Sequence, residues 1–244
     1  MIITDAVAPG TEPLADEGVL KLGLWLSPAF PVGGFTYSHG LEWAIEDGSV
    51  TSAATLEAWL RDILLHGAGR SDAILFAAAW RAVRASDAAR LGDVVELANA
   101  LQPTRERHLE ASAQGAAFAK AIGDTWATAE MADLVAGLGA RFGTVPWTYA
   151  VAVGFAAGCH RLALRPALAA FLQGFAANVV SAGVRAIPLG QTDGLRIVAR
   201  LAPVLLATCD EALAADLDDV GGAAVRADIA SMRHETQYTR LFRS

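Results

Sequence analysis

The sequence predicts an all-α fold, a single-domain helical bundle of about eight to ten helices with no sheet. Apolar residues recur at helical spacing, as in the stripe of Leu56, Trp59, Leu60, Ile63 and Leu64. Glycine and proline interrupt such segments at short intervals, which is typical of the short connections in a bundle. Alternation of apolar and polar residues, the pattern typical of strands, does not recur along the chain.

The composition is that of a protein with a large apolar core. The chain has 244 residues, of which 54% are hydrophobic and 18% are charged, enough for one domain. Its net charge of −7 disfavours a nucleic-acid partner. The two cysteines, Cys159 and Cys209, form no CxxC motif, so we expect reduced thiols and a cytoplasmic location.

The chain divides into three parts. Residues 1–17 contain two prolines and four acidic residues without a basic one, and we expect a mobile acidic arm. Residues 18–224 are expected to form the all-helical domain. Residues 225–244 are expected to form a C-terminal partner-binding tail, because their few aromatic residues stand among polar ones and cannot build a core alone.

Several helices of the domain can be placed individually. One further apolar stripe comprises Leu91, Val94, Val95, Ala98 and Leu101, and a longer one comprises Leu195, Val198, Ala202, Leu205, Cys209 and Leu213. Thr104 directly follows Pro103 and is expected to be a helix N-cap. After Gly190, we expect a helix to begin at Gln191 or Thr192.

Two segments are apolar enough to raise the question of a membrane. Phe142–His160 and Pro166–Val184 each run for 19 residues without a charged side chain. Both contain polar residues that would often lack partners in lipid, such as Thr148 and Asn178. We therefore interpret them as helices buried within protein, partly in an interface, and expect no membrane contact.

The stretch "SPAFPVGGFTYSHGLEWAIEDG", Ser27–Gly48, combines a glycine-rich turn with a Ser-His pair. A phosphate-binding loop of the Walker type needs a lysine after the glycines, and here Phe35 follows instead. Adjacent residues at a helix start point in different directions, so Ser38 and His39 are a poor nucleophile and base. Ser38 is more simply explained as the N-cap of the next helix.

The remaining chemically active residues give no catalytic or metal constellation. The five histidines do not form HxxxH or HExxH spacing, and Cys159-His160 is interpreted as a structural pair; transient contact with a metal is the alternative. The charge run Arg105–Glu110 is typical of a solvated helix face, although it could also anchor a partner. Arg185 interrupts an apolar segment and needs a partner for its charge.

Three stretches together resemble the urease accessory protein F family: "SPAFPVGGFTYSHGLEWAIEDG", "VRAIPLGQTDG" and "MRHETQYTRLFRS". The segments "TRERHLEASAQG" and "VPWTYAVAVGFAAG" add weaker similarity, and the resemblance extends over nearly all of residues 20–244. It implies a cytoplasmic all-α protein that forms homodimers, carries no cofactor or resident metal and is not an enzyme.

The resemblance also implies a place in urease maturation. Members of the family act as adaptors or chaperones that bind accessory protein D or H and recruit the GTPase called G. The assembly inserts nickel into apo-urease. The alternative is a GTPase-activating regulator that supplies an arginine in trans to protein G, for which Arg233 and Arg240 are candidates.

The residues expected to contact partners, or to order the contacting surface, lie in the three stretches. Glycine would shape the loop, and arginine and aromatic side chains would act as anchors. The candidates are Pro31, Gly33, Phe35, Tyr37, Glu42, Arg185, Gln191, Arg233, His234, Glu235, Tyr238, Arg240 and Phe242.

Overall fold

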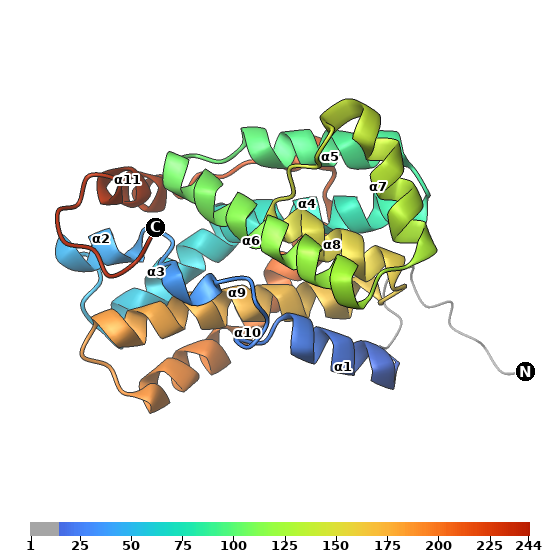
Figure 1. Cartoon of the computed structure of the whole chain (residues 1–244). Helices are drawn as coiled ribbons and strands as arrows, with labels where there is room; N and C mark the ends of the chain where they lie inside the picture. The colour runs from blue at the N-terminus through green and yellow to red at the C-terminus, as the bar shows by residue number, and fades with distance from the viewer. Residues whose placement is uncertain (1–14) are drawn as a thin grey trace, which may run out of the picture.

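The computed structural model describes residues 15–244, in which helices are joined by loops and no strand occurs (Figure 1). The all-α fold expected from the sequence is confirmed. The α-helices are α1 (Asp16–Trp25), α2 (Leu41–Glu46), α3 (Ala53–His66), α4 (Ala68–Arg84), α5 (Ala88–Ala100), α6 (Arg105–Thr125), α7 (Ala129–Phe142), α8 (Tyr149–Cys159), α9 (Leu164–Ala186), α10 (Gln191–Ala214) and α11 (Val225–His234). Two short 3₁₀ turns are η1 (Gly34–Thr36) and η2 (Leu217–Asp219).

The N-terminal arm expected at 1–17 falls mainly outside the described residues. Residues 1–14 are not described, and of the remaining three, Asp16 and Glu17 form the first turn of α1. Acidic side chains are favoured there, because the amino end of a helix carries a partial positive charge.

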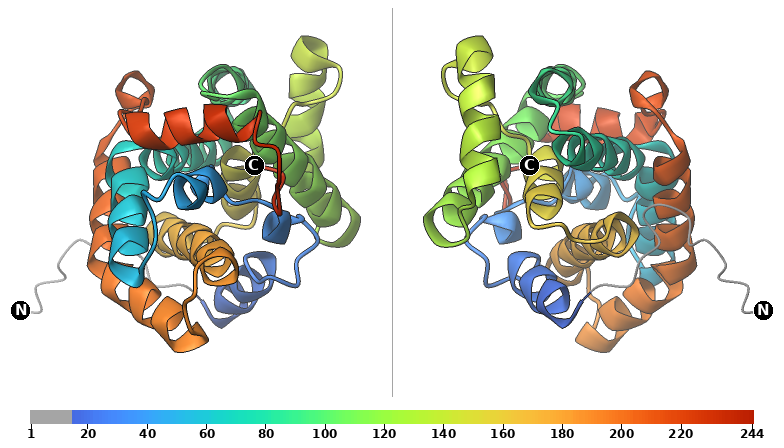
Figure 2. Two further views of the ribbon diagram at one scale, coloured as in Figure 1. Left: turned by 90° about the vertical axis from the view of Figure 1, so that its left-hand side faces the viewer. Right: turned by 90° about the vertical axis from the view of Figure 1, so that its right-hand side faces the viewer.

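Helix α8 lies at the centre of the molecule. Every residue from Ala150 to Cys159 is buried, and α4 and α6 pack against the helix. Figure 2 looks along the bundle and shows α8 enclosed by other helices. The interpretation of this apolar segment as a helix buried within protein is therefore confirmed for α8, although residues 143–148 form a loop before it.

Helix α9 is the one described helix that is long and apolar enough to cross a membrane by length and composition. In the structure it packs against α10, α4 and α2, and its buried residues include Leu168, Phe171 and Leu172. The core helix of a soluble protein meets the same length and composition test, so the length and composition of α9 are weak evidence for a membrane span.

Most predicted helix features are found where the sequence placed them. The stripe from Leu56 to Leu64 is buried on α3, and Leu91, Val94, Val95 and Ala98 are buried on α5. Leu101 follows the end of α5 and is exposed. Thr104 is the N-cap of α6, where its hydroxyl accepts a hydrogen bond from the Arg107 N–H at 3.0 Å. Helix α10 begins at Gln191.

The apolar stripe expected on α10 is confirmed at Leu205 and Cys209 but wrong in the first half of the helix. Leu195 is 72% exposed, whereas the buried face comprises Gly194, Ile197, Leu201, Val204, Leu205, Thr208, Cys209 and Ala212. At the start of the helix Gly194 packs directly on α9, since a Cβ at this position would lie 2.9 Å from Cγ2 of Val184. The glycine thus lies on the buried face where the leucine pattern placed Leu195.

Glycine also lets α6 approach the loop before α8. A Cβ at Gly115 would lie 2.2 Å from the carbonyl oxygen of Trp147, so no larger residue fits without a shift of backbone. Gly123 lies on the same helix, and a Cβ there would meet nothing within 4 Å. Comparing the same substitution at Gly115 and Gly123 therefore separates the effect of packing on stability from the effect of helix propensity.

We expect Gly115→Ala to lower the free energy of unfolding by roughly 1–3 kcal/mol, because the added methyl group displaces the 145–148 loop. Gly123→Ala should instead raise it by about 0.5–1 kcal/mol through helix propensity alone. Urea denaturation of both variants measures the difference. Equal effects in the two variants would contradict close packing at Gly115.

Candidate functional site

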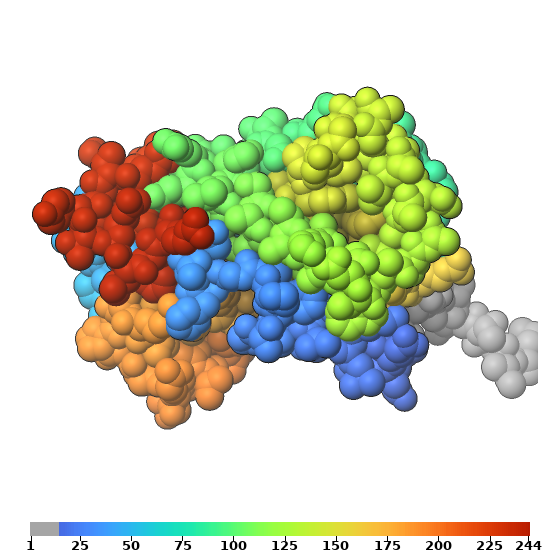
Figure 3. Space-filling model, in the orientation of Figure 1, coloured from blue at the N-terminus to red at the C-terminus, as the bar shows by residue number. Residues whose placement is uncertain are grey.

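The C-terminal residues do not extend away from the bundle. Helix α11 packs on α2 and α6, and residues 235–244, here called the C-terminal segment, return across the same face toward η1 (Figure 1). In the space-filling view these residues lie directly against α6 and the loop before α2 (Figure 3). The host surface that the aromatic residues of this region require is supplied by the chain itself.

His234 attaches α11 to two other helices. Its side chain is fully buried, with Nδ1 2.6 Å from Oε2 of Glu106 on α6 and Nε2 3.0 Å from Oε2 of Glu42 on α2. An imidazole ring donates from both nitrogens only when both carry a proton. A ring with a proton on each nitrogen would donate to both carboxylates, and Arg240 supplies a positive charge to Glu106.

The same two carboxylates hold the C-terminal segment. The backbone N–H groups of Leu241 and Phe242 donate to Oε1 and Oε2 of Glu42 at 2.6 and 3.0 Å. Arg240 donates from Nη1 to Oε1 of Glu106 at 2.8 Å. Because Glu42 and Glu106 each bind both His234 and the segment, the path of residues 235–244 depends on both.

Ser244 is buried at the end of the segment. Its hydroxyl donates to Oε2 of Glu110 at 2.5 Å, and its carbonyl oxygen accepts from the Ser38 N–H at 2.8 Å and from the Ser38 hydroxyl. The Arg243 N–H donates to the carbonyl oxygen of Thr36 at 2.8 Å. These contacts join the C-terminal segment to the glycine-rich loop, residues 27–40.

Ser38 is only in part the helix cap that the sequence predicted. The residue at the N-cap position of α2 is Gly40, with φ of +74°, and it offers no side chain. The Ser38 hydroxyl still accepts from the Glu42 N–H at 3.3 Å, a helix-start donor. Its second contact, to Ser244, could not be foreseen from local sequence.

The expectation of a solvated face at Arg105–Glu110 was wrong. Glu106, Arg107 and Glu110 are buried, and Arg107 and Glu110 form an ion pair with each other. Burial would raise the pKa of Glu110, but the charge of Arg107 and the contacts from His39 and Ser244 hold it well below its ordinary value. The alternating charges thus form a buried polar network covered by α11 and the C-terminal segment.

Arg185 of α9 is the residue for whose charge the sequence indicated no partner. Its guanidinium donates from Nη2 to the carbonyl oxygen of Phe35 at 2.9 Å. The guanidinium carbon also lies 3.5 Å from the centre of the Phe35 ring and 4.6 Å from that of Phe242. Aromatic faces and a carbonyl therefore stabilise the charge, and they connect α9, the glycine-rich loop and the C-terminal segment.

The sequence-predicted residues fall into two groups. Tyr37, Glu42, His234 and Phe242 are buried and order the surface from within, and Glu235 is half-buried and accepts from the Arg105 N–H at 2.9 Å. The exposed ones are Pro31, Gly33, Phe35, Arg185, Gln191, Arg233, Tyr238 and Arg240. Gln191 is the first residue of α10.

Sequence reasoning missed part of the exposed apolar surface. Val225, Ile229 and Met232 are at least half exposed, and they stand at i, i+4 and i+7 on one face of α11. Leu241 is 75% exposed beside the fully exposed Tyr238. The helical spacing within 225–234 could have indicated the first three residues. We call these five residues the exposed apolar strip.

The Cys159-His160 pair has structural contacts in this fold. Burial raises the pKa of the Cys159 thiol to about 12, which keeps it protonated and a poor metal ligand. His160 lies with Nε2 3.0 Å from the carbonyl oxygen of Trp126 and Nδ1 3.3 Å from Nζ of Lys21. Across residues 15–244, no group of three His, Cys, Asp or Glu side chains is placed to hold a metal ion.

We expect His234→Ala to lower the free energy of unfolding by roughly 3–5 kcal/mol, because the buried carboxyl groups of Glu42 and Glu106 both lose the ring that they bind. His108→Ala, at an exposed position of α6, should change it by less than about 0.5 kcal/mol. Urea denaturation measures both, and hydrogen exchange should show loss of protection at the Leu241 and Phe242 amides in the first variant. Retained protection of these amides would refute the role given to His234.

Comparison with known proteins agrees with this architecture. A family model described as UreF matches residues 50–202. A protein of Rhodopseudomonas palustris (strain HaA2) named urease accessory protein UreF is 53% identical over 232 residues, covering 94% of this chain and 96% of that protein. One of the same name from Methylobacterium radiotolerans is 51% identical, covering 92% of this chain and 96% of its own length. The chain therefore belongs to the UreF family of urease accessory proteins.

Proposed function

We propose that this chain acts in the cytoplasm as an adaptor in urease maturation. In this role it forms a homodimer, binds accessory protein D or H and recruits the GTPase G, and the assembly inserts nickel into apo-urease. The chain itself performs no catalysis in this scheme. The names of the similar proteins support a part in urease maturation, and the surface described above supports the adaptor role.

The observation that carries the proposal is the exposed apolar strip on an ordered support. Tyr238 and Leu241 are exposed on a segment whose backbone is bound by Glu42 and Ser38 and whose Arg240 side chain is bound by Glu106. A fixed backbone lowers the entropy lost on binding, and exposed aromatic and aliphatic side chains are the residue types that anchor interfaces.

Arginine residues border the strip. Arg233, Arg240 and Arg243 are exposed, and Arg105 lies close by on α6, in a groove shared with Leu109 and Phe242. A local excess of positive charge on a chain of net charge −7 favours a partner surface with acidic residues at the rim. The groove and the strip together would orient accessory protein D or H.

Removing the tail is a poor test of this surface. A deletion from Arg233 onward would also remove His234 and Ser244, and with them the buried contacts to Glu42, Glu106 and Glu110. Substitutions of exposed side chains separate binding from folding.

We expect the double variant Tyr238→Ala, Leu241→Ala to bind accessory protein D or H at least about 30-fold more weakly, because both anchors are lost. Its free energy of unfolding should change by less than about 0.5 kcal/mol, since both side chains are exposed. Isothermal titration calorimetry measures the affinity. Leu195→Ala, an exposed leucine on α10, is the matched control and should bind normally. Unchanged affinity of the double variant would refute the adaptor surface.

The second candidate function is that of a regulator supplying an arginine to the GTPase. One observation favours Arg233 over Arg240: within residues 15–244 the Arg233 guanidinium has no ion pair, whereas Arg240 is held by Glu106. An arginine already paired is less available for a phosphate.

Under the adaptor proposal, Arg233→Ala should leave GTP turnover per assembled complex within about twofold, because no catalytic group is removed. An arginine finger would instead lose roughly 10³-fold or more in turnover with assembly intact. Turnover by protein G, normalised to complex measured by light scattering, distinguishes the two. Arg226→Ala, also exposed on α11, is the control for the loss of one positive charge.

A further inference from the structure

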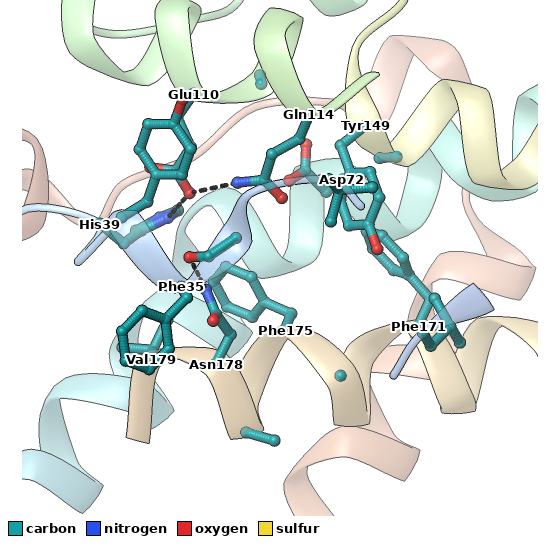
Figure 4. A pocket seen from close by; sticks show the side chains of 18 of the residues that line it. Phe35, His39, Asp72, Glu110, Gln114, Tyr149, Phe171, Phe175, Asn178 and Val179 are labelled. Carbon is teal, nitrogen blue, oxygen red and sulfur yellow. Dashed lines mark hydrogen bonds and ion pairs between the residues drawn. The ribbon is translucent and has the colours of Figure 1, made fainter. Parts of the chain in front are cut away.

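A cavity of about 300 Å³ lies beneath the glycine-rich loop, between that loop and α4, α6, α8 and α9 (Figure 4). Its walls are largely aromatic, with Phe30, Phe35, Tyr149, Phe171 and Phe175 among the lining residues. None of the functions discussed above uses this space. Its volume suits a small organic molecule better than a single water.

Several polar groups that line the cavity have no partner. Within the described part of the chain, the Asp72 carboxylate of α4 makes no hydrogen bond and no ion pair. The hydroxyl of Thr148 is 3% exposed and also has no hydrogen-bond partner. Figure 4 shows Asp72 beside Tyr149 and Gln114, away from His39. Thr148 is buried, whereas Asp72 is half-buried and lines the cavity; polar groups in such positions without protein partners indicate a ligand or ordered water.

The charge balance of the cavity is negative. Among residues 15–244, Arg107 is the one arginine or lysine that lines it, and this arginine already forms an ion pair with Glu110. Burial lowers the pKa of His39 to about 4, so this histidine is neutral near pH 7. Burial raises the pKa of Asp72 to about 6 although the charge of Arg107 opposes the shift, so its carboxylate is mainly ionised near pH 7 and makes no ion pair within the described residues.

We propose that this cavity binds a small organic ammonium ion, with its N–H groups directed to Asp72 and its alkyl part against the aromatic walls. The carboxylate supplies an acceptor and the opposite charge, and aromatic faces attract cations. The acceptor set suits N–H donors better than a divalent metal ion, because no group of three metal-ligating side chains lies within residues 15–244. This inference does not depend on the proposed adaptor function.

The test uses the full chain and n-butylammonium as the probe. Calorimetry at about pH 7.5 should give a dissociation constant in the millimolar range or tighter, as small ligands of this size allow. n-Butanol, which lacks the charge, should bind at least about tenfold more weakly. Asp72→Asn keeps the shape of the side chain, removes a half-buried charge that has no ion pair and should fold normally.

In Asp72→Asn, the affinity for n-butylammonium should fall at least about tenfold, while Asp62→Asn, at an exposed position of α3, should leave it unchanged. The affinity of the natural chain should also fall about tenfold between pH 7.5 and pH 5, as Asp72 is protonated. Arg107, Glu110, His39, Tyr37 and Tyr149 are the other titratable groups that line the cavity, and of those with a shifted pKa only His39, at about 4, comes near this window.

Three results would overturn the proposal. These are absence of n-butylammonium binding, equal binding of n-butanol, and equal affinity in the Asp72→Asn variant. Tighter binding of Ni²⁺ than of n-butylammonium, lost in Asp72→Asn, would assign the cavity to a metal ion instead and would also overturn it.

Discussion

The position of the C-terminal segment depends on one buried contact, in which an imidazole ring lies between two carboxylates. His234 lies between Glu42 and Glu106, and these carboxylates also bind the backbone of Leu241 and Phe242 and the side chain of Arg240. Removing one partner from such a group leaves the others unpaired in a low dielectric, which costs several kcal/mol. The arrangement therefore specifies one path for the chain after α11.

This arrangement changes what kind of binding surface the molecule has. A free tail would lose conformational entropy when it meets a partner, whereas an ordered segment has lost it during folding. In this surface, buried residues such as Glu42 and His234 affect binding only because they fix the position of exposed residues such as Tyr238. An adaptor with an ordered segment can thus reach a given affinity with fewer contacts.

The glycine-rich loop connects the C-terminal segment to the interior. Its residues Thr36 and Ser38 bind the segment, and its residues Phe35 and His39 line the cavity that contains Asp72. Arg185 contacts both Phe35 and Phe242, so α9 supports the loop and the segment together. The "GGFTYSH" stretch therefore contacts the C-terminal segment on one side and lines the cavity on the other.

The sequence by itself determined the all-α class, the buried stripe of α3, the Thr104 cap and the family, because these follow from local periodicity, local hydrogen bonding or direct similarity. It also selected most residues of the candidate surface. Only the tertiary structure decided which of them are buried. Glu106 and Glu110 look solvated in a helix of alternating charges, and they become buried because residues 128 and 134 positions further along the chain, His234 and Ser244, cover and bind them. The buried face at the start of α10 was likewise visible only in the structure, where Gly194 packs on α9. Contacts between residues far apart in sequence leave no local periodicity, and so one sequence read alone could not reveal them.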